Sequence, residues 1–539
     1  MRESPHPASA QSPADLVVLG ADIRTADPTN PRASALAARD GHIVHAGGNA
    51  EARAFIGRRT RVLEGRGILV LPGLIDSHGH VKGLGNALAQ VDLVGARSVG
   101  EVAARAAAGP VDRGWTLGRG WDQNAWEPAE LPRHEALSAA VPERPVLLRR
   151  VDGHAVLVNR RAMEIAGITR ASPDPPGGRI VRGPDGAPAG VLIDNAIDLV
   201  TPHLPAETVA SVRAAIERAE AHLLARGVTL AGDAGVVEPG LAAYRALRAE
   251  GALRLRVYVM VEAPGAAFEE ALRRGPEIDP EARLLVRAVK LFADGALGSR
   301  GAALFVPYDD DPENDGLLLH APEAMEEILR RTVEAGFQPC VHAIGDRANR
   351  LVLDIFERLL AGRDARRVRP RIEHAQILAP EDIPRFAGLG VIASMQPIHC
   401  TSDMPWAESR LGPERIRGAY AWRSLAKTGA HLASGSDFPV ESADPLLGLH
   451  AAVTRAERRP PHRAWQPGER LTFDEALATY TREGARAAFL EDRLGRLAPG
   501  MDADFVLIEG VIPEDPQSLL TGRVRATFVA GELAAGATP

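Results

Sequence analysis

Two histidines one residue apart, His78 and His80, lie at the end of the apolar run LVLPGLIDSHGHV, residues 69–81. In an extended chain, alternate side chains point to the same side. Two neutral imidazoles on one side of a strand can bind a divalent metal ion, and adjacent same-face imidazoles have little other structural purpose. The pair therefore indicates a metal site at the end of this run.

Further polar side chains lie at the ends of later apolar runs: Lys290, His342, His374 and Asp437. Histidines and a carboxylate are suitable ligands for zinc or another divalent ion. Each has a structural alternative, because a lone core histidine often only hydrogen-bonds its neighbours and Asp437 could cap a helix or turn. Their joint occurrence on separate runs favours a metal centre.

Lys290 is the unusual member of this set, because a protonated lysine repels a metal ion. It can join the set as a carbamate, formed with carbon dioxide, that bridges two metals. The alternative is a buried lysine paired with Asp294 or another carboxylate. The residues alone leave both interpretations open.

The polar residues must be positioned by the apolar runs that carry them. After the opening run, strands are predicted at 227–235, 253–263, 284–295, 337–346, 369–378, 390–399 and 430–439. Segments with a helical pattern, such as 206–227 and 321–336, lie between several of them. Eight such units predict an α/β fold, a TIM-like (β/α)8 barrel with its active site at the carboxyl ends of the strands.

Three parts of the chain fall outside this pattern. Residues 15–71 and 494–539 have short β-like runs, which predict one small composite β-domain built from both ends, around a barrel at 72–493. Residues 1–14 are rich in Ser, Pro and Ala and predict a disordered tail. The interval after the first strand is too long for one crossover, so we expect an inserted subdomain at about 87–200 that forms a lid or pocket wall.

Composition excludes several classes of function. The 539 residues carry a net charge of −7 without a basic block, which argues against nucleic-acid binding. No apolar run is long enough for a membrane span or a signal peptide. Only Cys340 and Cys400 are present, so a reducing, cytoplasmic setting is expected. The expected partner is a small-molecule substrate. The oligomeric state considered is a homodimer.

At this point the motifs resemble a known family. PGLIDSHGHV, VKLFADGALGSR, VHAIGDRA, RIEHAQ, SMQPIH and SGSDFPVE occur in this order, with GRLAPGMDADFVLI near the end. They are similar to the amidohydrolase superfamily, in particular the amidohydrolase-3 family that includes N-substituted formamide deformylases. The resemblance covers nearly the whole chain, and the fold that it implies is a (β/α)8 barrel with a β-sandwich built from both chain ends.

The resemblance also implies roles for the site residues. His78 and His80 would bind the more buried metal, a carboxylated Lys290 would bridge two metals, and His342 and His374 would hold the second. Asp437 would contact the first metal and the catalytic water. The cofactor expected is one or two divalent ions, with zinc as the first choice.

Residues outside the metal set are weaker candidates. His399 and His154 could hydrogen-bond the substrate, with structural roles as the alternative. Trp121 and Asp122, in GWDQNAW, could line the lid, although tryptophan is also a common packing residue. Arg300 could hold a substrate anion, and an internal salt bridge is the alternative.

The leading hypothesis is a metal-dependent hydrolase that acts on a non-peptide carbon–nitrogen bond of a small amide, such as an N-substituted formamide. Metal-activated water would attack the carbonyl carbon, with Asp437 as the catalytic acid and base. Alternatives are a deaminase, a cyclic amidase or an esterase with the same metal centre. A non-catalytic barrel that binds small molecules is a further alternative.

Overall fold

The structure is a computed structural model that describes residues 12–538, except 124–125, 151–154 and 176–177. The chain divides into two compact units. Residues 82–219 form one unit, and the segments on either side of them form the other.

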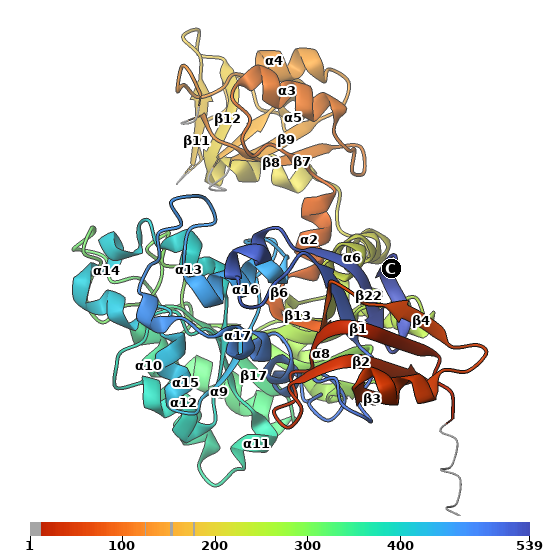
Figure 1. Ribbon diagram of the computed structural model, residues 1–539. Coiled ribbons are helices and arrows are strands. Elements are labelled where there is room, and N and C mark those ends of the chain that lie inside the picture. Colours follow the sequence, from red (N-terminus) through yellow and green to blue (C-terminus); the bar gives the residue numbers. More distant parts are fainter. Residues whose placement is uncertain (1–11, 124–125, 151–154, 176–177, 539) are drawn as a thin grey trace, which may run out of the picture. The chain divides into compact units, whose positions relative to one another are not determined.

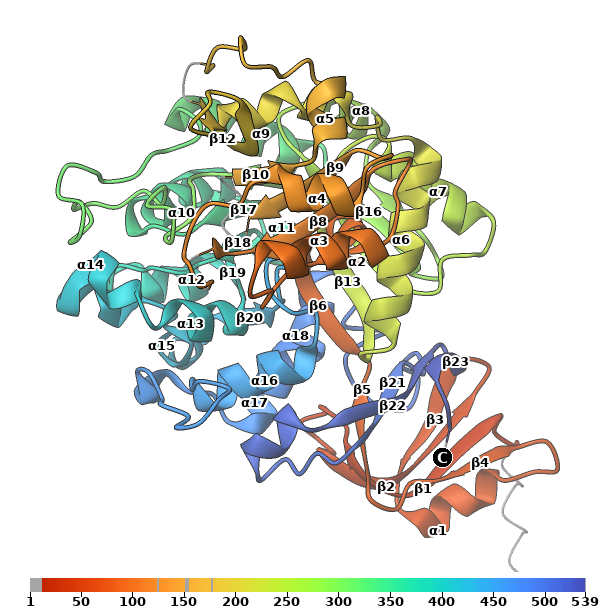
Figure 2. The same cartoon turned by 90° about the horizontal axis from the view of Figure 1, so that it is seen from above.

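Eight parallel strands form the centre of the larger unit (Figure 2). In chain order they are β6 (Leu74–Gly79), β13 (Val228–Val236), β14 (Arg256–Glu262), β16 (Leu284–Phe292), β17 (Gln338–Ala343), β18 (Arg371–His374), β19 (Ile392–Met395) and β20 (His431–Ser434). Beyond β20 the chain returns to β6, because Asp437 N–H donates to His78 O (2.8 Å) and His80 N–H donates to Phe438 O (2.7 Å). The predicted (β/α)8 barrel is therefore confirmed.

The strands are buried on both sides, as expected for a parallel sheet covered by helices. Every residue of β6, β18 and β19 is buried, and their sequences read as short apolar runs broken by the site residues. Amphipathic helices supply the outer layer; α10, for example, buries Val352 and Phe356. The helices between β13 and the end of the barrel include α7 (Gly240–Ala249), α8 (Ala266–Arg274), α9 (Pro322–Glu334), α10 (Asp346–Leu360), α12 (Ile383–Leu389), α13 (Pro397–Asp403), α15 (Trp422–Lys427), α17 (Phe473–Thr479) and α18 (Arg482–Ala487).

Several strands are shorter than the apolar runs predicted. β20 ends at Ser434, whereas the run extends to residue 439, and β18 ends at His374. The backbone turns sharply at both places: His374 has φ 76° and Asp437 has φ 59°, in the left-handed region that ordinary residues rarely adopt. Such outliers cost of order 1–3 kcal/mol each and cluster at functional sites.

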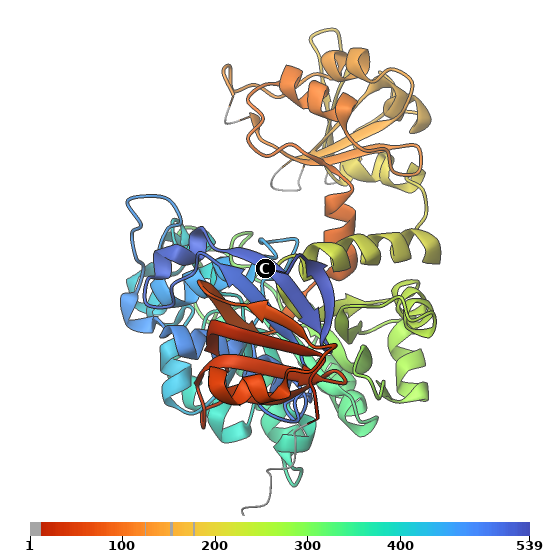
Figure 3. The same ribbon diagram turned by 45° about the vertical axis from the view of Figure 1, so that its right-hand side comes forward.

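Strands from both ends of the chain form one sheet, coloured red and blue in Figure 3. Its order is β23 (Glu532–Gly536), β22 (Arg523–Val529), β21 (Phe505–Glu509), β5 (Ile68–Pro72), β1 (Leu16–Arg24), β2 (Arg32–Arg39) and β3 (His42–Gly47), with β4 (Arg61–Glu64) also paired to β1. The antiparallel pairing of β21 with β5 joins the two ends of the chain. Both ends of the chain therefore contribute strands to one sheet, and the separate β-domain at 15–71 and 494–539 stays a prediction.

A buried ion cluster connects this sheet to the barrel. Arg256, at the start of β14, is 1% exposed, and its guanidinium lies 2.8 Å from Asp504 Oδ2 and 2.9 Å from Asp502 Oδ2. Burial alone would lower the pKa of Arg256, but the two carboxylates outweigh this effect and raise it. The cluster accounts for the acidic residues in the motif GMDADFVLI, which precede β21.

Replacing Arg256 with Met is expected to reduce the free energy of unfolding by about 3–5 kcal/mol, because the buried charge of Asp504 would lose its guanidinium partner and Asp502 would keep its pair with Arg493. Urea denaturation monitored by circular dichroism measures the change. The control is Arg330→Met, which breaks exposed pairs with Glu327 and Glu334 and should cost less than about 1 kcal/mol. Equal losses in the two variants would contradict the assigned role of the cluster.

The unit of residues 82–219 has its own sheet, in the order β11 (Gly178–Arg182), β12 (Pro188–Asp194), β10 (Ala155–Val158), β9 (Val146–Arg150), β8 (Thr116–Trp121) and β7 (Val91–Asp92). Two apolar clusters cover its faces, one with α3 (Val99–Ala108) and α4 (His134–Ala140), the other with α5 (Arg160–Ile165) (Figure 1). The unit follows β6 in the chain, as the long interval predicted. Its role as a lid stays a prediction.

None of the helices in the described residues is long and apolar enough to cross a membrane. Of the predicted disordered tail, residues 1–11 lie outside the described part of the chain. Ala14 is buried, and its backbone N–H donates to Phe55 O.

Candidate metal centre

The barrel brings the predicted ligands together at one cavity of about 340 Å³. All six predicted metal ligands line it, and so does His399. His78 lies in β6, Lys290 in β16, His342 in β17 and His374 at the end of β18. Since parallel strands close the barrel, their carboxyl ends meet around one axis, and residues far apart in sequence become neighbours.

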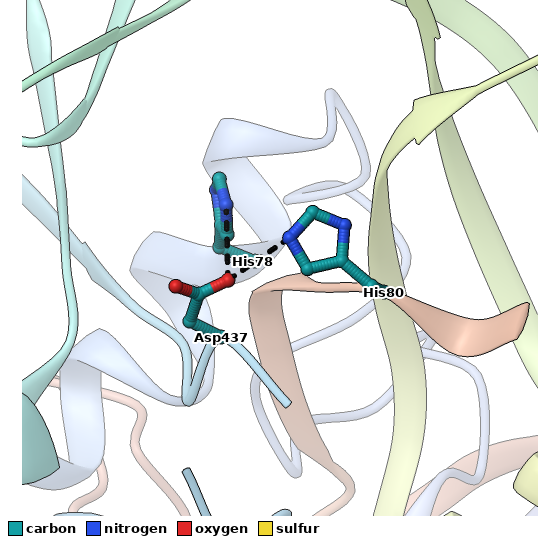
Figure 4. Close-up of side chains that lie close together, drawn as sticks. All are labelled: His78, His80 and Asp437. Carbon is teal, nitrogen blue, oxygen red and sulfur yellow. Dashed lines mark ion pairs between the residues drawn. The ribbon is translucent and has the colours of Figure 1, made fainter. Parts of the chain in front are cut away.

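Asp437 lies between the two histidines of the opening motif (Figure 4). Its Oδ1 is 3.1 Å from His80 Nε2 and 3.7 Å from His78 Nε2. On the far side of each ring, His80 Nδ1 is 2.8 Å from Ala234 O, and His78 Nδ1 is 2.6 Å from a carboxylate oxygen of Glu373. Since Nδ1 of a neutral ring must carry the proton to donate to these oxygens, each Nε2 presents a lone pair to the cavity.

A second group shares Asp437. His374, His399 and Asp437 have ligand atoms within 4.8 Å of one another, and the same holds for His78, His80 and Asp437. The rings of His374 and His399 are stacked at 5.9 Å between centroids, and the His342 ring lies 4.5 Å from that of His374. His399, predicted only as a substrate contact, therefore also has the geometry of a ligand.

The charges at the cavity favour an ionised carboxylate and neutral imidazoles at three of the histidines, whereas at His80 the hydrogen bond and charge of Asp437 outweigh burial and raise the pKa. Burial lowers the pKa of His78 to about 4 and that of His342 to about 3, and holds the pKa of His374 well below its ordinary value. Burial alone would raise the pKa of Asp437, but His80 and the other imidazoles outweigh it and keep this pKa well below its ordinary value. Neutral imidazoles and an ionised carboxylate are the protonation states that a metal ion requires.

Lys290 is fully buried, and its Nζ lies 3.2 Å from His78 Nε2. Burial lowers the pKa of Lys290. The alternative pairing with Asp294 does not occur, because Asp294 instead accepts backbone N–H groups of Ala303, Ile344 and Gly345 at 2.8–3.0 Å. Among the described residues, no carboxylate lies within 4.0 Å of Lys290 Nζ.

The residues fit a bound metal ion. In the described part of the chain, three buried atoms at the cavity have no hydrogen-bond partner: Asp437 Oδ1, His342 Nε2 and His399 Nε2. Leaving such atoms unsatisfied costs about 1–3 kcal/mol each. His80 Nε2 lies 3.1 Å from Asp437 Oδ1. If this nitrogen carries a lone pair, the two atoms repel each other unless a cation lies between them. The donor set of imidazole nitrogens and a carboxylate is typical of a zinc site.

The glycine between the two histidines is required by packing. A Cβ at Gly79 would overlap the ring of Phe438, which is fully buried and follows Asp437 in the chain. The close approach of Phe438 to Gly79 holds the Asp437 loop against the end of β6, and the two backbone hydrogen bonds that close the barrel lie at this point.

Sequence reasoning missed the residues that hold the ligand rings. Glu373 contacts His78, and Gln396 Oε1 lies 2.7 Å from His374 Nδ1. One signal was present, because Arg371 and Glu373 are two charged residues on the same side of a short, otherwise buried strand. Gln396, in SMQPIH, had no comparable signal.

The remaining predicted substrate contacts have other partners. Arg300 does not line the cavity, and its guanidinium is 3.1 Å from Asp310, so the internal salt bridge is present. Within residues 82–219, Trp121 is buried and donates to Leu148 O, and Asp122 pairs with Arg150. His154 lies outside the described residues. Roles for these four residues in substrate binding stay predictions.

Comparisons with known proteins identify the family of the chain. The sequence model that describes the amidohydrolase family matches residues 61–535 of this chain. The chain is 37% identical to the protein LONG AFTER FAR-RED 3 of Arabidopsis thaliana, covering 96% of this chain and 91% of that protein. It is 27% identical to an N-substituted formamide deformylase of Arthrobacter pascens, covering 96% and 98% of the two chains.

A solved structure has the same fold. An uncharacterized metal-dependent hydrolase of Pyrococcus horikoshii superposes with a TM-score of 0.78 at 29% identity, over 93% of this chain and 98% of that one. The family match over nearly the whole chain and the cluster of ligand residues at the barrel mouth lead to one conclusion. The chain belongs to the amidohydrolase family and is a metal-dependent hydrolase of carbon–nitrogen bonds other than peptide bonds.

Proposed function

We propose that this protein hydrolyses the carbon–nitrogen bond of a small amide, with N-substituted formamides as the first substrate class to test. The observation that carries the proposal is the position of Asp437, an ionised, nearly buried carboxylate with one oxygen facing His78 and His80 and the other 3.6 Å from His399 Nε2. The relative of Arthrobacter pascens, whose name states deformylation of N-substituted formamides, supports the substrate class.

Zinc is the metal that the donor set supports best, as one or two ions. His78, His80 and Asp437 would hold the first, His342 and His374 would hold the second, and a carboxylated Lys290 would be a ligand of both. Bound zinc lowers the pKa of a water molecule toward neutrality and polarises a carbonyl oxygen. The unpartnered Nε2 of His342 supports a ligand set larger than the opening pair.

The residues of the chain perform the proton transfers. Asp437 accepts the proton of the attacking water and delivers it to the leaving nitrogen, because its two oxygens face both halves of the cavity. His399 Nε2 faces the same carboxylate and can donate a hydrogen bond to the oxygen that gains negative charge. Neutral His78 and His80 keep their Nε2 lone pairs directed at the cavity and take no proton from the substrate.

Lys290 is proposed to be carboxylated. Its neutral amine would attack the carbon of carbon dioxide, forming an N–C bond and releasing one proton, which leaves a carbamate with two oxygen ligands. The support is that Lys290 Nζ is buried next to His78 without a carboxylate partner. A carbamate would turn a cation among ligand atoms into an anion that binds metal.

The cavity limits the size and polarity of the substrate. Its volume of about 340 Å³ lies at the lower end of the range for ligand sites. Besides the histidines, the lining includes Phe292, Leu297, Ile344, Trp406 and Val440. Apolar and aromatic side chains of this kind suit an N-alkyl or N-aryl substituent better than a peptide backbone.

A substrate panel tests the proposal. Purified protein loaded with zinc is incubated with N-benzylformamide, N-butylformamide, a cyclic amide, an aminated heterocycle and an aryl ester, and formate, amine and ammonia are measured. We expect equal amounts of formate and amine from the formamides. Ammonia without formate would instead show a deaminase, and turnover only of the cyclic amide or ester would show those activities. Failure to turn over any member, together with no bound metal, would favour a non-catalytic barrel.

The cellular setting follows from the same observations. Cys340 and Cys400 are free, buried thiols, which supports a reducing, cytoplasmic location. The net charge of −7 supports a small molecule rather than a nucleic acid as the partner. A homodimer stays a prediction.

A further inference from the structure

The ring of His78 is held by a carboxylate that the proposed reaction does not use. His78 Nδ1 lies 2.6 Å from Glu373 Oε2, and neither side chain is exposed. The proton of His78 therefore lies on Nδ1, and Nε2 faces the cavity. A ligand histidine backed by a carboxylate is a more basic and better oriented ligand than one backed by water.

In two other predicted ligand histidines, His80 and His374, the hydrogen-bond partner of Nδ1 is a neutral group. His80 Nδ1 faces the backbone carbonyl of Ala234, and His374 Nδ1 faces the amide oxygen of Gln396. Among these three rings, His78 alone has a charged acceptor. The charged acceptor therefore belongs to the group formed by His78, His80 and Asp437.

The carboxylate of Glu373 is fixed and charge-balanced. Arg371 Nε lies 2.8 Å from Glu373 Oε1, and Arg371 Nη2 also donates to Ser77 O and Ser394 Oγ at 2.9 and 3.0 Å. Glu373 is therefore an ionised, immobile acceptor, and Arg371 removes the cost of a lone buried charge.

We propose that Glu373 is a positioning residue that sets the metal affinity of the centre by orienting and polarising His78. The inference rests on the proposed metal-dependent function. Glu373 does not line the cavity, and its oxygens face His78 and Arg371. Its effect must therefore appear first in metal binding and only secondarily in turnover.

The test compares zinc affinity in full-length variants stripped of metal by dialysis against a chelator. Zinc is titrated in competition with a chromophoric chelator of known affinity. Glu373→Gln keeps a hydrogen-bond acceptor of the same shape but removes the charge, and we expect zinc to bind about 10–100-fold more weakly. At saturating zinc, we expect a smaller loss in kcat than in zinc affinity.

Two further variants separate positioning from general destabilisation. Glu357→Gln makes the same chemical change at an exposed helix position paired with Arg385, and zinc affinity should not change. The double variant Arg371→Gln/Glu373→Gln removes both buried charges together. We expect it to recover the thermal stability lost in Glu373→Gln while zinc binding stays weak.

The outcomes are distinguishable. Zinc affinity within twofold of the parent protein in folded Glu373→Gln would overturn the inference, and so would recovery of zinc affinity along with stability in the double variant. If the parent protein itself binds no zinc or other divalent metal, the proposed function fails, and the inference fails with it.

Discussion

Replacement of Asp437 by Asn should lower kcat by about 10³-fold, because an amide cannot accept the proton of the attacking water or return it to the leaving nitrogen. The carboxylate is ionised and nine-tenths buried, and both of its oxygens face imidazoles. No other carboxylate lies within 4.0 Å of His80 or His399 in the described part of the chain. A substitute base is therefore lacking.

The fold of this variant should be intact. Asn tolerates the left-handed backbone conformation found at Asp437, where φ is 59°, about as well as Asp does. Steady-state kinetics on the best formamide of the panel, with zinc content and melting temperature measured on the same samples, tests the prediction. Asp354→Asn makes the same change at an exposed ion pair with Arg385 and should keep the parent rate. A near-normal rate in Asp437→Asn would remove Asp437 from the catalytic role.

Removal of the metal should abolish turnover and lower stability. The proposed ligands come from β6, β16, β17 and β18 and from the loop after β20, so a bound ion connects the two ends of the barrel sheet. A ligand that binds only the folded state at a thousand times its Kd stabilises it by about 4 kcal/mol. Chelation followed by calorimetry should show a lower melting temperature, and added zinc should restore both stability and turnover.

Metal analysis and a crystal structure complete this test. One or two equivalents of zinc per chain would give the number of ions, and electron density for a carbamate on Lys290 would support the bridging assignment. An unmodified Lys290 in crystals of the zinc-loaded protein would exclude that assignment. Full turnover in protein freed of metal would contradict the metal-dependent mechanism itself.

The site shows why strand-end residues were accessible to sequence reasoning. His78, Lys290, His342 and His374 each interrupt a short apolar run, and a parallel barrel must bring the carboxyl ends of those runs together. Asp437 was predicted from the same pattern, although β20 ends at Ser434, three residues before it. All six predicted ligands line one cavity, and their role in metal binding stays a prediction.

Other features depended on contacts between distant segments. Glu373 lies 295 positions from His78 in the chain, and Arg256 lies 248 positions from Asp504. Side-chain packing decides such pairs, and no local pattern encodes them. The same is true of Trp121 and Asp122, whose residue types suited a pocket but whose partners lie within their own unit.

The sequence by itself determined the barrel, the family and which polar residues lie at the strand ends, because buried strands and polar strand ends leave a periodic, local pattern. Only the tertiary structure decided which nitrogen of each histidine faces the cavity, that Lys290 has no carboxylate partner, and that Glu373 and Gln396 hold the ligand rings. These features depend on which side chains meet once the barrel closes. Closure is a property of the whole chain, so no single segment of the sequence carries it.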